Sequence, residues 1–315
     1  MKKLVFLLFA GMCLAGDLCV MFWNVENFFD IRDEPWKHDG DFMPGGILHY
    51  TYRACRLKTE HLAEVINHAG PHILCMAEVE NRTVLEGLRD RLYHQGEWEI
   101  FIDEGPDIRG IDPALMYRKS CAEYVSHGYY PVFIAERGYH SRPIMRADLA
   151  LKESGDTLSV FINHWPSRRG GKRATDPYRM HAAKVLLEAV KALRREHPGY
   201  TVLITGDLND ARNDSSVQHL CAEPGIRYLE NSLSRKVQGT YCHNGEWIHF
   251  DHLLIAHPER PVLFVTQAYV VAPFWTREKE THAPLPFYRG VNFAGGYSDH
   301  YPVCVKLEAK RKSVE

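Results

Sequence analysis

The sequence has no marked excess of charge of either sign. Its 38 lysines and arginines nearly balance its 40 aspartates and glutamates, and the formal net charge at pH 7 is −2. This balance argues against a protein that coats nucleic acid through bulk positive charge, so any polyanion site must be local. With 45% hydrophobic and 25% charged residues, the composition is that of a soluble globular protein.

The common zinc-binding patterns are also missing. The chain has no CxxC pair, and its 18 histidines form no HExxH motif. A zinc site built on thiolates or on a metalloprotease helix is therefore disfavoured. Of the seven cysteines beyond Cys13, we expect Cys19, Cys75 and Cys304 to be small core residues because they lie in apolar runs. An odd cysteine count in an exported chain implies at least one free thiol or an intermolecular link.

No apolar run is long enough to span a bilayer. The longest, "LVFLLFAGMCLAG", follows Lys2 and Lys3 and ends in small residues. This layout predicts a bacterial signal peptide over residues 1–16, cleaved after Ala15 or Gly16, and hence an exported protein that is periplasmic or secreted. The alternative is a buried first strand or helix, which the paired lysines make less attractive.

Strand-like apolar runs alternate with helical patterns along the rest of the chain. Helical periodicity covers residues 54–69 and 178–197, and a shorter helix is expected after Thr83. Asn244-Gly245 between apolar flanks predicts a β-hairpin. The predicted strands are 18–25, 72–79, 98–103, 114–118, 146–152, 158–165, 201–207, 250–256 and 301–308.

This order predicts a layered α/β protein with one catalytic domain over residues 17–310 and a short charged tail over 311–315. No repeat and no Pro/Ser-rich linker interrupts it. Two long irregular stretches, 30–52 and 271–296, are the expected binding loops because compact domains seldom carry such loops without a function.

Polar residues stand at the edges of many of the apolar runs. Each has an ordinary explanation by itself, such as a turn, a helix cap or a satisfied imidazole. Together they supply the carboxylate and amide oxygens that magnesium, or manganese in its place, prefers. Since residues two apart in a strand point the same way, Asp207 and Asn209 are expected to reach one centre. The oxygen-bearing set is Asn24, Glu78, Asp207, Asn209, Asp251 and Asp299.

Six motifs in order give the chain a family resemblance. They are "FWNVENFFD" (22–30), "MAEVEN" (76–81), "INHWPSR" (162–168), "TGDLND" (205–210), "FDHLLI" (250–255) and "YSDHYPV" (297–303). With these motifs the chain resembles the endonuclease/exonuclease/phosphatase superfamily, typified by deoxyribonuclease I and exonuclease III. The resemblance implies a four-layer α/β sandwich, with two mixed β-sheets face to face and helices outside, and metal-dependent hydrolysis of phosphoesters.

The resemblance also assigns roles to single positions. It implies a metal site at Asn24, Glu78 and Asp299. His300 resembles the catalytic general base, and Asp251 is placed as the carboxylate that fixes its tautomer. The family commonly has a glutamine before the metal-binding glutamate, where this chain has Ala77 followed by Glu78-Val79-Glu80; we place the metal at Glu78.

The remaining catalytic roles fall to His164, Asp207 and Asn209. Asp207 and Asn209 resemble the pair that orients nucleophile and phosphate, and His164 resembles the histidine that faces a phosphate oxygen or the leaving group. The retention of Asp207, Asp251 and His300 argues against a non-catalytic binding protein on the same fold. A monomer without a stable protein partner is expected.

The substrate class is left open by these motifs, because the same constellation serves nucleic acids, phosphoinositides, phospholipids and small phosphoesters in this superfamily. One segment favours an extended polyanion. "WPSRRGGKR" directly follows His164, and its glycines and basic side chains suit contacts with successive phosphates. We therefore expect an endonuclease-like phosphodiesterase, with Arg168, Arg169, Lys172 and Arg173 binding substrate. Phe274, Trp275, Phe287 and Tyr288 are candidate stacking residues for bases.

Overall fold

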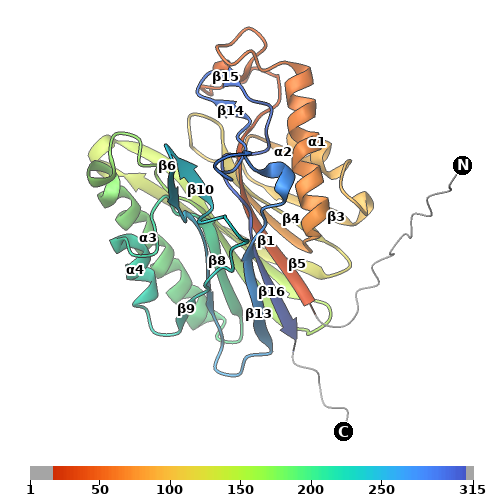
Figure 1. Ribbon diagram of the computed structural model, residues 1–315. Coiled ribbons are helices and arrows are strands. Elements are labelled where there is room, and N and C mark those ends of the chain that lie inside the picture. Colours follow the sequence, from red (N-terminus) through yellow and green to blue (C-terminus); the bar gives the residue numbers. More distant parts are fainter. Residues whose placement is uncertain (1–16, 310–315) are drawn as a thin grey trace, which may run out of the picture.

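The computed structural model describes residues 17–309, apart from the side chain of Tyr139. The predicted signal peptide (1–16) and the charged tail (311–315) lie outside these residues. Two mixed six-stranded sheets face each other, as the sequence predicted (Figure 1). Across residues 17–309, none of the helices combines the length and the apolar character that a membrane crossing requires.

The first sheet contains one parallel pair, β1 with β2, among antiparallel neighbours. In spatial order its strands are β13 (Leu263–Val270), β16 (Val303–Ala309), β1 (Asp17–Phe28), β2 (Ile73–Val79), β4 (Asp112–Arg118) and β3 (Trp98–Ile102). The second sheet also has one parallel pair, β7 with β8. Its order is β5 (Ala122–Ile134), β6 (Tyr139–Leu151), β7 (Thr157–His164), β8 (Thr201–Asp207), β12 (Asp251–Ala256) and β9 (Ile226–Tyr228).

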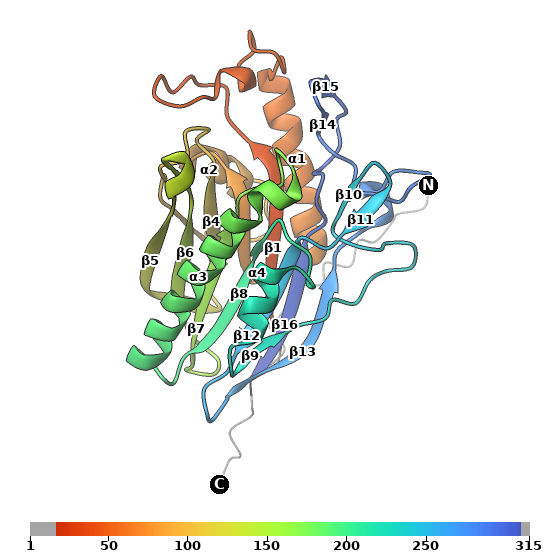
Figure 2. The ribbon, with the colours of Figure 1, turned by 90° about the vertical axis from the view of Figure 1, so that its left-hand side faces the viewer.

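Helices cover the outer face of each sheet, which makes four layers. Helices α1 (Tyr52–Ala69) and α2 (Arg82–Arg89) pack on the first sheet. Helices α3 (Lys172–Glu196) and α4 (Ser215–Cys221) pack on the second (Figure 2). Two small hairpins, β10 (Tyr241–His243) with β11 (Glu246–Ile248) and β14 (Tyr288–Arg289) with β15 (Asn292–Phe293), complete the strands. Short 3₁₀ turns occupy Gly40–Phe42, Gln95–Glu97, Ala135–Arg137 and Phe274–Thr276.

Continuous apolar runs arise because the central strands are buried on both faces. In β1, Val20 and Phe22 face the core between the sheets, whereas Cys19 and Met21 face the helical layer. Cys75 and Cys304 are likewise fully buried, so all three cysteines expected in the core are confirmed there. The predicted Asn244-Gly245 turn joins β10 to β11, with both residues at positive φ.

The sequence patterns missed both long edge strands, β5 and β13. An edge strand exposes much of its surface, so neither shows a continuous apolar run. Pro131 lies inside β5 at a register shift, a position that is tolerated only at a sheet edge or a bulge.

The predicted start of the second helix, at residue 178, was wrong. Helix α3 begins at Lys172 and contains Pro177. Side-chain donors satisfy carbonyls in this first part of the helix. Thr175 Oγ1 donates to Gly171 O at 3.0 Å, and Arg179 Nη2 donates to Lys172 O at 3.3 Å. These side-chain hydrogen bonds stabilise the helical turns before Pro177, so the helix begins at Lys172 although a proline lies within it.

Candidate active site

The two sheets meet at a group of polar side chains drawn equally from both. The first sheet contributes Asn24, Glu78, Asp299 and His300, and the second contributes His164, Asp207, Asn209 and Asp251. In the second sheet, the ends of parallel β7 and β8 place His164 beside Asp207. Antiparallel β12 begins next to them, which pairs Asp251 with Asp207. The tertiary fold thus brings together the eight catalytic and metal positions predicted from the sequence.

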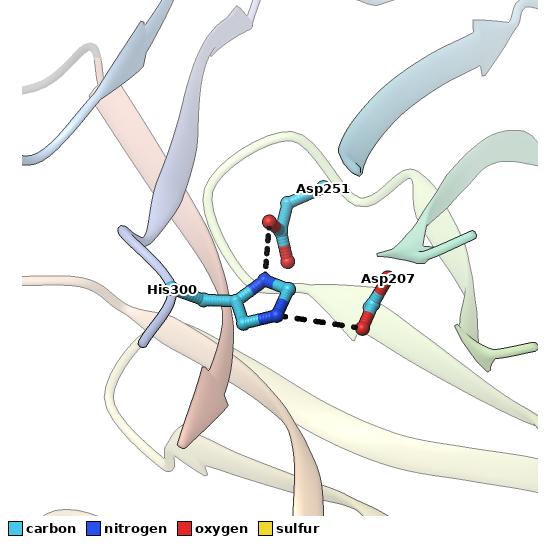
Figure 3. A group of neighbouring side chains, drawn as sticks. All are labelled: Asp207, Asp251 and His300. Carbon is cyan, nitrogen blue, oxygen red and sulfur yellow. Dashed lines mark hydrogen bonds and ion pairs between the residues drawn. The ribbon is translucent and has the colours of Figure 1, made fainter. Parts of the chain in front are cut away.

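His300 and Asp251 form a close contact between the two halves of the site. His300 Nδ1 lies 2.8 Å from Asp251 Oδ2, and Nε2 lies 3.8 Å from Asp207 Oδ2 (Figure 3). Burial opposes the charged imidazolium, but Asp251 and Asp207 outweigh it and hold the pKa of His300 well above its usual range. Asp251 is fully buried, so it can fix the ring orientation and leave Nε2 to face the reacting groups.

Asn24 links the carboxylates of the two sheets. Its Nδ2 donates to Asp207 Oδ2 at 3.0 Å and to Glu78 Oε1 at 3.3 Å, while its Oδ1 accepts from Glu26 N. The sequence predicts an amide oxygen that faces a metal. In this structure the nitrogen faces the carboxylates, because the Glu26 backbone N–H already engages the oxygen.

The carboxylates provide a hard-ligand environment, and the positive charges that interact with them come from His300, Arg142 and Lys58. Burial raises the pKa of Asp207 to about 6 and that of Asp299 to about 6, with His300 partly opposing both shifts. Among the described residues, three ligand atoms lie within 4.8 Å of one another in one group, Asp207, Asp251 and His300. Asp251 Oδ1 is buried without a hydrogen-bond partner. The repulsion of Asp299 by Glu78 and Asp207 fits a divalent cation held by these carboxylates, which would relieve it.

His164 closes the side of the site next to Glu78. Its Nε2 lies 3.6 Å from Glu78 Oε1 and 3.8 Å from Asp207 Oδ2. Burial, reinforced by Arg142 and Arg109, lowers the pKa of His164 well below its usual range. The imidazole is therefore neutral at pH 7.

Arg142, on β6, is a site residue that the sequence analysis missed. Its guanidinium is almost fully buried and donates from Nη2 to Trp165 O at 2.6 Å, directly after His164. Nη1 lies 3.5 Å from Asp107 Oδ2, and Nε is buried without a partner. Burial lowers the pKa of Arg142, while Asp107, Glu78 and Asp207 act in the opposite direction. An arginine within the strand sequence "SRPIM" was the available signal.

One detail of the predicted set needs correction. Asn209 does not share a strand face with Asp207. It lies in the turn after β8 at a φ of 51°, where its N–H donates to Asp207 Oδ1 and its Nδ2 donates to Trp165 O. The two glutamates differ in their surroundings: Glu80 is fully buried and accepts from Asp30 N at 2.6 Å, whereas Glu78 accepts from Asn24 Nδ2.

The basic segment after His164 is not the open loop that the sequence suggested. Arg168 Nη2 lies 3.1 Å from Asp210 Oδ1 and 2.6 Å from Asp214 Oδ2. Lys172 lies in the first turn of α3 and pairs with Asp176 and Asp214. These carboxylates already engage two of the four predicted phosphate-binding side chains, whereas Arg169 and Arg173 are exposed.

The residues predicted to stack on bases differ in their exposure. Phe287 is buried in a cluster with Phe29 and Tyr50, so it is a core residue. Trp275 packs against His68 in the last turn of α1, with the ring centroids 4.9 Å apart. Phe274 is 79% exposed.

Comparison with known proteins agrees with this architecture. The sequence model of the endonuclease/exonuclease/phosphatase family matches residues 19–309. A comparison with curated protein sequences finds no match.

Solved structures share the fold over nearly their full lengths. A family protein from Bacteroides thetaiotaomicron has a TM-score of 0.64 at 17% identity, covering 94% of this chain and 98% of that one. The mannosyl-6-phosphatase of Bacteroides thetaiotaomicron has a TM-score of 0.62 at 17% identity, covering 92% and 99%. TDP2 from D. rerio, complexed with a single-strand DNA product, has a TM-score of 0.60 at 14% identity, covering 92% and 98%.

The match to the family model spans nearly all of the described chain. The chain therefore belongs to the endonuclease/exonuclease/phosphatase family of phosphoester hydrolases.

Proposed function

We propose that this protein is an exported, magnesium-dependent phosphodiesterase that activates water through His300. The observation that carries the proposal is the Asp251–His300 pair, 2.8 Å apart, facing a cluster of carboxylates. A neutral His300 Nε2 accepts a proton from water, and Asp251 stabilises the imidazolium that forms. The attack on phosphorus expels an alcohol on the opposite side.

A divalent cation would be held by Glu78 and Asp299, with Asp207 available from the other sheet. When bound, it supplies positive charge to the phosphoryl oxygens. On this chain's side, the neutral His164 donates a hydrogen bond to a phosphoryl oxygen, and Asn24 holds Glu78 and Asp207 in place. Manganese can replace magnesium at oxygen ligands.

Metal removal tests this part directly. We expect the chelated protein to lose phosphodiesterase activity and to regain it with magnesium or manganese. Glu78→Gln is expected to raise the magnesium concentration needed for half-maximal activity at least tenfold, since one charged ligand is lost. Activity that returns with zinc alone would contradict the proposal.

A nucleic-acid strand is the substrate that we propose, supported by Arg169 and Arg173. Both are exposed and follow His164 in the sequence, whereas Arg168 and Lys172 are ion-paired. Exposed arginines can bind successive phosphates of a strand. The double variant Arg169→Gln/Arg173→Gln should cleave DNA or RNA several-fold more slowly, with a weaker salt dependence, and should hydrolyse a small chromogenic diester at the normal rate.

A substrate panel separates this proposal from its alternatives. Wild type is assayed with DNA, RNA, a phospholipid diester, a phosphoinositide and a sugar phosphate. Faster turnover of a monoester or lipid than of either nucleic acid would replace the substrate proposal with a phosphatase or lipid phosphodiesterase and leave the metal mechanism intact.

A further inference from the structure

A buried ion pair behind the active site has no role in the mechanism described so far. Arg179, on α3, is fully buried, and its Nε lies 2.8 Å from Asp210 Oδ1. Asp210 is 1% exposed and directly follows Asn209 in the turn after β8. An arginine buried in this way is costly unless its charge and donors are satisfied.

The same guanidinium also contacts the segment that follows His164. Arg179 Nη1 donates to Pro166 O at 3.3 Å and to Thr175 Oγ1 at 2.8 Å. Nη2 pairs with Asp176 at 2.5 Å. One side chain of α3 therefore contacts both the turn that carries Asn209 and the chain just beyond His164.

Asp210 is held from further directions, which makes the turn a rigid unit. Its Oδ2 accepts from Ser216 Oγ at 2.6 Å, and its carbonyl oxygen lies 2.8 Å from His252 Nε2. Arg168 Nη2 lies 3.1 Å from its Oδ1, while Arg168 Nε donates to Asn209 O at 2.8 Å. Asn209 itself donates to Trp165 O, so the two segments are joined next to the reacting groups.

We propose that Arg179 is a positioning residue, which acts through Asp210 and Pro166 to hold Asn209 and His164 in register at the active site. The proposal rests on the proposed function for its kinetic readout. The physical reason is that a displacement of about 1 Å in a reacting group can reduce the rate about 10²-fold while affecting substrate binding much less. The ion pair of Arg179 with Asp210 and its hydrogen bond to Pro166 O restrict such displacements.

The kinetic test uses Arg179→Met, Arg179→Lys and the exposed Arg195→Met on the same helix as a matched control. We expect Arg179→Met to lower kcat about 10- to 100-fold with KM changed less than threefold and the pH profile unmoved, because the Asp251–His300 pair stays intact. Arg179→Lys should recover part of the loss, since it keeps the charge beside Asp210. Arg195→Met should match wild type.

A double-variant cycle tests whether the effect passes through Asp210. If it does, Arg179→Met/Asp210→Asn loses about as much kcat as the worse single variant. A loss equal to the product of the two single effects would overturn the coupling.

Hydrogen exchange gives a readout that does not need activity, and so separates failure of this proposal from failure of the proposed function. In Arg179→Met, exchange should speed up at least tenfold in peptides covering 164–168 and 207–211, with peptides covering β5 and β6 unchanged. Unchanged exchange in both site segments, or a uniform increase across the protein, would overturn the positioning role. If Arg179→Met does not fold, Arg179→Lys is measured by the same two criteria.

Discussion

The two halves of the active site are held by different means. On the second sheet, ion pairs between Arg168, Arg179, Asp210 and Asp214 fix the segments after His164 and Asp207. The half from the first sheet has more residues in the left-handed region, since Glu26, Asn27 and Glu78 have φ values of 53°, 52° and 66° whereas the other half has Asn209 at 51°. Such conformations cost energy in non-glycine residues and persist only where surrounding contacts impose them.

Buried charges impose those contacts on the first half. Glu26 accepts from the backbone N–H groups of Phe287 and Tyr288, and the fully buried Lys58 donates to Tyr297 O at 2.7 Å. Burial raises the pKa of Glu26 to about 7 and lowers that of Lys58 to about 8. The comparison teaches that ion pairs between side chains hold one half, whereas in the other half the charged side chains of Glu26 and Lys58 are held by backbone groups.

The largest effect is expected where the halves join, at Asp207. Asp207 accepts from Asn24 and faces both histidines. Asp207→Ala should lower turnover by about 10³-fold or more, because metal, water and phosphate lose a common orienting group. Its metal-free melting temperature should equal or exceed that of wild type, since the variant removes one of several repelling carboxylates. Near-normal turnover would show that the halves do not cooperate through Asp207.

A second test changes the contact between Asp251 and His300, which joins the two halves. Wild-type activity should fall as pH drops, because His300 must be neutral to accept a proton. Its raised pKa places that fall above the usual imidazole range of about 6 to 7. Asp251→Asn should shift the fall to lower pH and reduce kcat about 10²-fold or more, since the tautomer is no longer fixed. An unshifted profile would remove His300 from the role of general base.

The smallest effect concerns Glu80, two residues from Glu78 on the first half. Burial raises the pKa of Glu80 to about 8, far above its value in an unfolded chain. Its neutral form therefore contributes stability that is fully present below about pH 4 and is lost as pH rises through about 8. Glu80→Gln should keep activity within about twofold and exceed wild type in stability at pH 9 by about 1 kcal/mol or more. Equal urea unfolding curves at pH 9 would contradict this.

Much of the fold could be predicted because it depends on local patterns. The doubly buried strands of both sheets read as apolar runs, and α1 ends at Gly70, in a left-handed conformation, as the Gly-Pro signal predicted. The edge strands β5 and β13 could not be recognised, because their exposed residues follow no core pattern. The part of α3 before Tyr178 was missed because contacts made by Thr175 and Arg179 support it.

The sequence by itself determined the composition of the site: which oxygens and imidazoles stand at the ends of apolar runs, and in what order. The tertiary structure decided which charged side chains are available to bind substrate. Arg168 and Lys172 read as free phosphate ligands until the turn after β8 placed Asp210 and Asp214 beside them. Arg142 could not be recognised as a site residue from the sequence, because its contact with Trp165 O, directly after His164, is formed only in the folded structure. The physical reason is that charge pairing depends on distances of a few ångströms between residues far apart in the chain, and these distances exist only after the two sheets pack.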